Sequence, residues 1–177
     1  MQFEDNGKGL LVPSHKIIAA GKYHCELIRK GVKIDEWDDE NLVVNQGLNL
    51  LLGVMFNQQS QIANWYLGIF QGNYTPVASD TAATFPASST ECSSYTSPTR
   101  PLWQGAAPSG QSVTNSANPA VFTFNASQTI YGAFLVSNST IGGTAGSLYG
   151  AAQFSVPKNV VNLDQLLLTY AFAAASA

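Results

Sequence analysis

Charge is scarce in most of this chain. Of its nineteen Lys, Arg, Asp and Glu residues, fourteen lie before Asn41, and residues 41–177 contain only five. A globular domain is usually about 25% charged, and free monomers use surface charge to stay soluble and apart. Here Ser, Thr, Asn, Gln and Gly take those places, which predicts a subunit whose exterior is largely covered by neighbours. The five late charges are Asp80, Glu91, Arg100, Lys158 and Asp164.

Residues that carry catalysis are few as well. The chain has two histidines, His15 and His24, both near its start, where we expect solvent-facing or cross-strand roles. It contains no nucleophile elbow, Walker loop, zinc-binding repeat or His-Glu-x-x-His run. The acidic stretch 35–40 lacks the ligand order of an EF-hand, and the glycine-rich stretch 142–146 lacks the lysine and helix of a phosphate loop. These absences predict a protein that is not an enzyme and has no cofactor and no metal.

Further absences in the sequence argue against a membrane or a nucleic acid as a partner. No apolar run approaches the ~20 residues that a membrane-spanning helix needs, and the N-terminus lacks the pattern of a secretory signal. The net charge of −3 and the mixing of basic with acidic residues argue against nucleic acid. We therefore expect no membrane, no nucleic acid and synthesis in a cytoplasm. Cys25 and Cys92 are expected there as free, buried thiols rather than a disulfide.

Periodicity predicts a hairpin and one helix. Apolar residues alternate over 22–29 and again over 32–34, with a turn between them, and the acidic stretch is expected at the hairpin's far end or in the loop beyond. A helix is predicted over residues 46–56, with Asn45 as its N-cap. Its buried face follows the i, i+3, i+4, i+7, i+8 spacing of an amphipathic helix: Leu48, Leu51, Leu52, Met55 and Phe56.

The rest of the chain reads as short strands and turns. Strands are expected at 41–44 and 65–70, and the last sixty residues contain four more. The fold class is therefore mainly β, a β-sandwich or jelly roll with one short helix. An extended N-terminal arm, residues 1–18, precedes a single domain, 19–177. A long loop-rich insert at about 73–118 interrupts the domain and is expected to pack on something, such as a neighbour.

Several strands are apolar on both faces, so they are either covered on both sides within the chain or docked against another subunit. The residues predicted at interfaces lie in the arm, in the insert and in the last strand. They are Leu10, Leu11, Val12, Phe85, Tyr95, Leu102, Trp103, Tyr170 and Phe172.

Five stretches occur in an order that is known from another class of proteins. They are the hairpin stretch 21–31, the Asn-Leu-Val-Val-Asn-Gln-Gly-Leu-Asn entry into the helix at 41–49, the stretch 66–72 followed by Pro76 and by Asp80-Thr81, and the stretches 131–135 and 151–155. Together they resemble the small β-rich virion proteins of tailed bacteriophages, which include capsid decoration (cement) proteins and tail components. The insert at 73–118 has no counterpart in this resemblance.

The resemblance implies a non-enzymatic virion structural protein, with a capsid decoration subunit as the first expectation. It would be a homo-oligomer that contacts the major capsid protein or other virion proteins, located in the virion after synthesis in the host cytoplasm. One alternative is a tail or tail-tip component with the same fold. Another is a receptor- or glycan-binding module of the virion, with Trp37 or Trp103 as the stacking surface.

Overall fold

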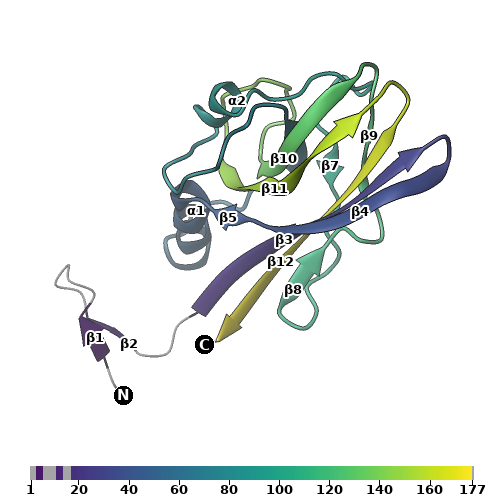
Figure 1. The fold of residues 1–177 in the computed structure, drawn as a ribbon. Helices are drawn as coiled ribbons and strands as arrows, with labels where there is room; N and C mark the ends of the chain where they lie inside the picture. Colours follow the sequence, from purple (N-terminus) through teal and green to yellow (C-terminus); the bar gives the residue numbers. More distant parts are fainter. Residues whose placement is uncertain (1–2, 6–10, 14–16, 177) are drawn as a thin grey trace.

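The computed structural model describes residues 3–5, 11–13 and 17–176, and it is a β-sandwich of two antiparallel sheets, which confirms the predicted fold class (Figure 1). The first sheet has the order β5 (Leu42–Val43), β11 (Leu148–Val160), β10 (Gln128–Val136), β6 (Trp65–Phe70) and β7 (Leu102–Trp103). The second has the order β4 (Val32–Glu40), β3 (Ile17–Arg29), β12 (Gln165–Ser176) and β8 (Ser112–Thr114), and β9 (Ala120–Thr123) also pairs with β12.

The predicted arm contains a small strand pair. β1 (Phe3–Asp5) and β2 (Leu11–Pro13) pair with each other and with no other strand of the described chain. The long strand β3 already begins at Ile17, inside the range predicted as arm. Leu10, one of the predicted interface residues, lies outside the described residues.

The predicted hairpin is present, and it is longer than expected. Its turn at Lys30–Gly31 has positive φ angles at both residues, 52° and 78°, which the glycine adopts without strain. The acidic stretch is strand β4 itself, so its expected place at the hairpin's end or in a following loop is wrong. Side chains alternate between the two faces of this strand. Asp35, Trp37 and Asp39 are half-buried on one face, while Glu36, Asp38 and Glu40 face solvent on the other.

The helix α1 (Asn45–Phe56) begins one residue earlier than predicted. Its N-cap is Val44, without a capping side-chain hydrogen bond, so the predicted Asn45 cap is wrong. The amide side chain of Gln46 fixes the helix start instead, because its Oε1 accepts hydrogen bonds from the Ala82 and Leu148 N–H groups at 2.9 and 2.8 Å. Gly47 lets the helix approach β11 closely, since any Cβ there would collide with the backbone oxygen of Tyr149.

The insert at 73–118 is part of the sandwich. It supplies the short helix α2 (Phe85–Ser88) and the strands β7 and β8. Phe85 is fully buried and meets the rings of Phe70 and Phe134 at centroid distances of 5.6 and 5.1 Å. The insert therefore packs on the chain's own sheets, and its order does not depend on contact with a neighbouring subunit.

A buried ion pair anchors the insert. Arg100 is fully buried, and its Nε and Nη2 each donate to the Glu91 carboxylate at 2.7 Å. Arg100 also donates to the backbone oxygens of Asn138 at 2.7 Å and Gly143 at 3.3 Å, and Glu91 accepts from the Gly142 N–H at 2.8 Å. The pair thus ties two parts of the insert to the loop between β10 and β11.

The larger cluster of buried apolar residues fills the space between the sheets, and the smaller one lies on the opposite face of the first sheet, where Phe85 of the insert covers Phe70 and Phe134. Both cysteines lie in the larger cluster, as free and buried thiols. Burial raises the pKa of Cys25 and that of Cys92, so both thiols stay protonated and unreactive at neutral pH.

A second ion pair closes the turn between β11 and β12. The buried Asp164 carboxylate accepts two hydrogen bonds from Arg29, at 2.9 and 2.7 Å, and one from the Val161 N–H at 2.9 Å. The hydrogen bond from Arg29 is the main cause that holds the pKa of Asp164 below its usual value. This pair connects the end of β3 to the start of β12.

Replacing Arg100 with Met removes the cation and leaves the Glu91 carboxylate buried without it. We expect the free energy of unfolding to fall by roughly 3–5 kcal/mol, as measured by urea denaturation. The control is Lys22→Met, which removes an exposed ion pair with Asp38 and should cost less than about 1 kcal/mol. Equal losses in the two variants would contradict a structural role for the buried pair.

Asp164→Asn should be less stable than the wild type at neutral pH, because Asp164 is ionised and paired in the folded state. A depressed folded-state pKa gives stability that is complete above the unfolded value of about 3.9 and is lost as the pH falls through the folded pKa. The difference in melting temperature between the two proteins should therefore shrink as the pH is lowered from 7 to below about 4. Thermal unfolding across this range measures it, and a constant or widening difference would refute the assignment.

Candidate functional site

The five charged residues after Asn41 are all held within the chain. Besides the Glu91–Arg100 pair and the buried Asp164, Asp80 is buried and accepts hydrogen bonds from the Tyr74 hydroxyl and the Val77 N–H. Lys158 is mostly buried, pairs with Asp35 at 2.9 Å and lies 4.2 Å from the centre of the Trp37 ring.

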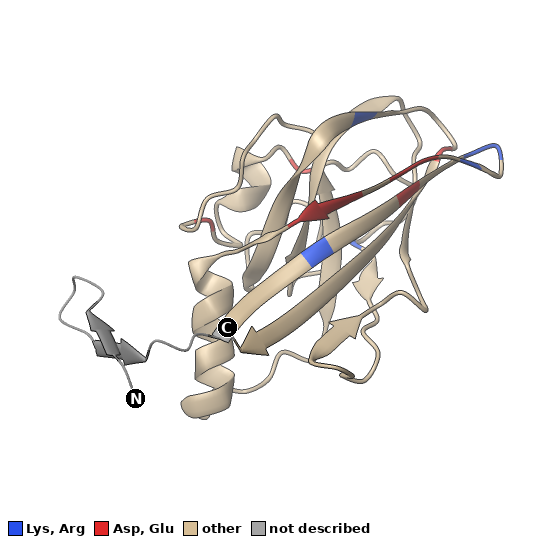
Figure 2. Cartoon of the chain, turned by 60° about the horizontal axis from the view of Figure 1, so that its bottom comes forward, with Lys and Arg blue, Asp and Glu red and all other residues tan. Residues whose placement is uncertain are grey.

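The exterior built by residues 41–176 therefore presents almost no free charge to solvent. Figure 2 shows the remaining described charges along β3, β4 and their turn. Residues 41–176 thus expose less charge than the sequence alone indicated, because their five charged side chains are engaged in contacts within the fold. A surface that is polar but neutral, beside one charged hairpin, is the main electrostatic feature of the molecule.

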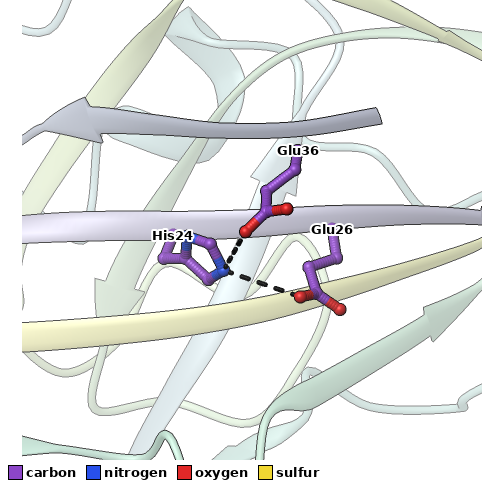
Figure 3. Close-up of side chains that lie close together, drawn as sticks. All are labelled: His24, Glu26 and Glu36. Carbon is purple, nitrogen blue, oxygen red and sulfur yellow. Dashed lines mark ion pairs between the residues drawn. The ribbon is translucent and has the colours of Figure 1, made fainter. Parts of the chain in front are cut away.

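The charged hairpin contains one cluster of metal-ligand type. His24 and Glu26 of β3 and Glu36 of β4 converge, with the His24 Nε2 3.8 Å from Glu26 and 3.5 Å from Glu36 (Figure 3). The other ring nitrogen, Nδ1, lies 2.8 Å from the Asp38 carboxylate. His24 therefore has the cross-strand role that was expected for it.

A lysine already neutralises this cluster. The Lys33 ammonium donates to Glu26 at 3.3 Å and to Glu36 at 2.5 Å, and the Lys33 hydrogen bond is the first cause of a lowered pKa at Glu36. All of these side chains are partly exposed, so a metal ion would have to displace the ammonium and compete with water. We interpret the cluster as a solvated ion-pair network.

The apolar face of α1 is the second unusual surface. The sequence predicted this face as buried, but four of its five residues are exposed, and the prediction is wrong for them. Leu48 is 38% exposed, Leu52 57%, Met55 70% and Phe56 76%. The helix packs on the sandwich through Gly47 and Leu50 instead, one step around its circumference.

A pocket opens beside this helical face. Its volume is about 260 Å³, and it lies where α1 covers one end of the sandwich. The walls come from α1, the segment that follows it, and strands of both sheets, and no charged residue lines it. The wall residues include Leu51, Val54, Ile62, Trp65, Trp103 and Phe172. Together with the exposed face of α1, this apolar pocket is the candidate functional site.

The predicted interface residues fall into three groups. Phe85, Tyr95 and Tyr170 are buried in the chain's own clusters, so their apolar surface is already used within the domain. Trp103 and Phe172 are half-buried and line the pocket, and Leu102 is exposed beside them on β7.

Leu11 and Val12 of the arm belong to β2, which pairs only with β1 among the described strands, and Leu10 lies outside the described residues.

The two tryptophans considered for glycan stacking differ in position. The Trp37 ring is covered by the Lys158 ammonium and by the edge contact with Phe154, whose centroid lies 5.3 Å away. Trp103 donates its indole N–H to the Tyr170 backbone oxygen at 3.1 Å, and its ring forms part of the pocket wall. Trp37 is thus not available as a stacking platform.

The sequence did not reveal the other pocket residues. Trp65 and Tyr149 belong to strands that were predicted, but strand prediction does not say which strand ends meet under a helix. The apolar face of the helix was the one sequence signal that pointed to this region, and it was interpreted as part of the core.

A scan of the chain against protein-family models gives no match, and a search of curated proteins finds no similar sequence. None of the helices in the described ranges has the length and apolar character to cross a membrane. The function is therefore inferred from the chain's own residues.

The exposed face of α1 can be tested with two matched substitutions on one helix. Leu50→Ala removes a buried side chain and should lower the free energy of unfolding by roughly 2–5 kcal/mol. Leu52→Ala removes an exposed one and should cost less than about 1 kcal/mol in dilute protein. Chemical denaturation of both variants measures the difference, and similar losses would mean that the isolated chain buries both side chains.

Proposed function

We propose that this chain is a non-enzymatic structural subunit of a bacteriophage virion, with a capsid decoration (cement) protein as its specific role. The observation that carries the proposal is the neutral exterior of residues 41–176, whose five charges are all held by contacts within the chain. The resemblance of the ordered motifs to small virion proteins supplies the kind of assembly.

A neutral exterior suits burial against other subunits. Interface centres are depleted in Lys, Glu and Asp, because each buried charge must be desolvated. Ser, Thr, Asn and Gln can instead exchange hydrogen bonds with water for hydrogen bonds with a neighbour at small cost. Repetition in a symmetric particle then adds many modest contacts into a stable shell.

The action that we propose is mechanical. The subunit would bridge adjacent capsid proteins, so that the outward pressure of packaged DNA is shared over more contacts. The sandwich suits such a role, because one ion pair holds the insert to the loop between β10 and β11 and another closes the turn between β11 and β12, so that both resist local opening. Such bridging needs neither a bound cofactor nor a reacting side chain.

Virions that lack the protein should form with normal dimensions but release their DNA at a lower temperature than complete virions. Heating both kinds of particle and measuring nuclease-sensitive DNA tests this, and adding purified protein back should restore the wild-type release temperature. Difference density between the two particles locates the subunit. Density on the tail would replace the cement role by a tail role, and unchanged DNA release with no missing density would refute both.

A further inference from the structure

We propose that the pocket beside α1 binds a small, neutral aromatic molecule, one oxygen of which accepts a hydrogen bond from the Tyr149 hydroxyl. This inference goes beyond the proposed structural role and does not depend on it. The molecule occupies the pocket itself, and the exposed Phe56 of α1 is no part of the pocket walls.

The pocket reaches into the core of the sandwich. Its walls include strands of both sheets, since Leu135 and Tyr149 belong to the first sheet and Tyr170 belongs to the second. These three side chains are members of the larger buried cluster, with exposed fractions of 4%, 7% and 0%. A pocket whose walls are core residues is concave, which is the form that small-molecule sites take in proteins.

The Tyr149 hydroxyl is the buried polar group of these walls that lacks a partner. Tyr149 is more than nine-tenths buried, and its hydroxyl is shielded from solvent without a hydrogen-bond partner among the described residues. The other hydroxyl of the walls, on Tyr170, accepts from the Asn41 Nδ2 at 3.1 Å, and the Trp103 indole N–H donates to a backbone oxygen. A buried hydroxyl without a partner loses its hydrogen bonds to water and gains none in return. A ligand oxygen that accepts from Tyr149 would remove this cost.

The Tyr149 ring is held by two other wall residues. It meets the rings of Trp65 and Phe172 edge to face, at centroid distances of 5.7 and 5.5 Å. Burial raises the pKa of the Tyr149 hydroxyl, so the group stays protonated at neutral pH and can act as a donor. The ligand group that it selects is therefore an acceptor, such as a carbonyl oxygen.

The walls also define the rest of the ligand. A cavity of about 150 Å³ lined by apolar side chains holds a benzene molecule, so a pocket of about 260 Å³ has room for roughly ten non-hydrogen atoms. Aromatic walls such as Trp65, Trp103 and Phe172 can meet the edge or the face of a bound ring. No charged residue lines the pocket, so an ion would lose its hydration without gaining a counter-charge. A sugar would bring several hydroxyl groups to one unpartnered donor, and each hydroxyl left unpaired would oppose binding.

The test is a titration of purified, full-length protein with two probes of the same shape. Acetophenone carries a carbonyl oxygen beside its ring, and α-methylstyrene has a methylene group in place of that oxygen. Both should bind saturably, as followed by NMR chemical shifts, and both should raise the melting temperature as their concentration increases. Because α-methylstyrene is the more apolar probe, the ratio of the two affinities, rather than either affinity alone, reports on the hydrogen bond.

Tyr149→Phe removes the hydroxyl and keeps the ring. It should weaken the binding of acetophenone relative to that of α-methylstyrene by roughly three- to ten-fold, which is the value of one hydrogen bond. The ligand-free variant should unfold at the same temperature as the wild type or at a higher one, because the hydroxyl has no partner to lose. A lower melting temperature with an unchanged affinity ratio would mean that the hydroxyl is bonded within the chain, and it would refute the assigned role.

Two further variants should block the pocket. Val113→Trp and Ile62→Trp each place an indole ring in the pocket, and either should abolish the binding of both probes. The matched control is Val32→Trp, which puts the same ring at an exposed position beside the β3–β4 turn and should leave binding unchanged. Circular dichroism shows which variants keep the fold, and the second pocket variant serves if the first does not fold.

Three results would overturn the inference. They are the absence of saturable binding by either probe up to its solubility limit, binding that persists in a folded pocket variant, and an affinity ratio that Tyr149→Phe leaves unchanged. Self-association of the wild type that is lost in the pocket variants, without any binding of the probes, would assign the pocket to a side chain of a second copy instead. The location of the subunit in virions tests the proposed function separately, so the two can fail independently.

Discussion

The buried pair of Glu91 and Arg100 fixes the part of the chain that local sequence leaves undetermined. It holds both ends of a ten-residue stretch of the insert against the loop between β10 and β11. The chain then continues directly into β7, where Trp103 becomes a wall of the apolar pocket. A buried ion pair gains little net stability over an apolar pair, but it strongly penalises any arrangement that separates its partners. The pocket therefore depends on an interaction that selects one packing of the insert.

The neutral exterior follows from the same use of charge. Each charged residue after Asn41 is engaged inside the fold, at the insert, at the turn between β11 and β12, or over the Trp37 ring. What remains outside is polar without charge, together with an apolar helix face at one end. A neutral exterior of this kind suits burial against other subunits, and it is the physical basis of the proposed role.

The sequence predicted the elements whose signals are local. Alternation gave the hairpin and the later strands, and the helical spacing placed α1 to within one residue. It failed for β4, because a run of acidic residues that occupies both faces of a strand looks like a loop, and for the insert, whose order comes from contacts between distant residues such as Phe85 and Phe134. The helix face was found, but four of its five residues are exposed rather than buried in the core. Periodicity identifies an apolar face of a helix, and it does not say whether the domain itself covers that face.

A neutral exterior also determines how contacts made through it respond to their surroundings. Attraction between charged surfaces is screened by ions, with a Debye length near 10 Å at 0.1 M salt. Contacts built from uncharged polar groups and apolar side chains lack this sensitivity, and excluded salts such as sulfate strengthen them. Because apolar burial weakens on cooling, temperature rather than charge screening would govern how firmly the proposed subunit holds any neighbour.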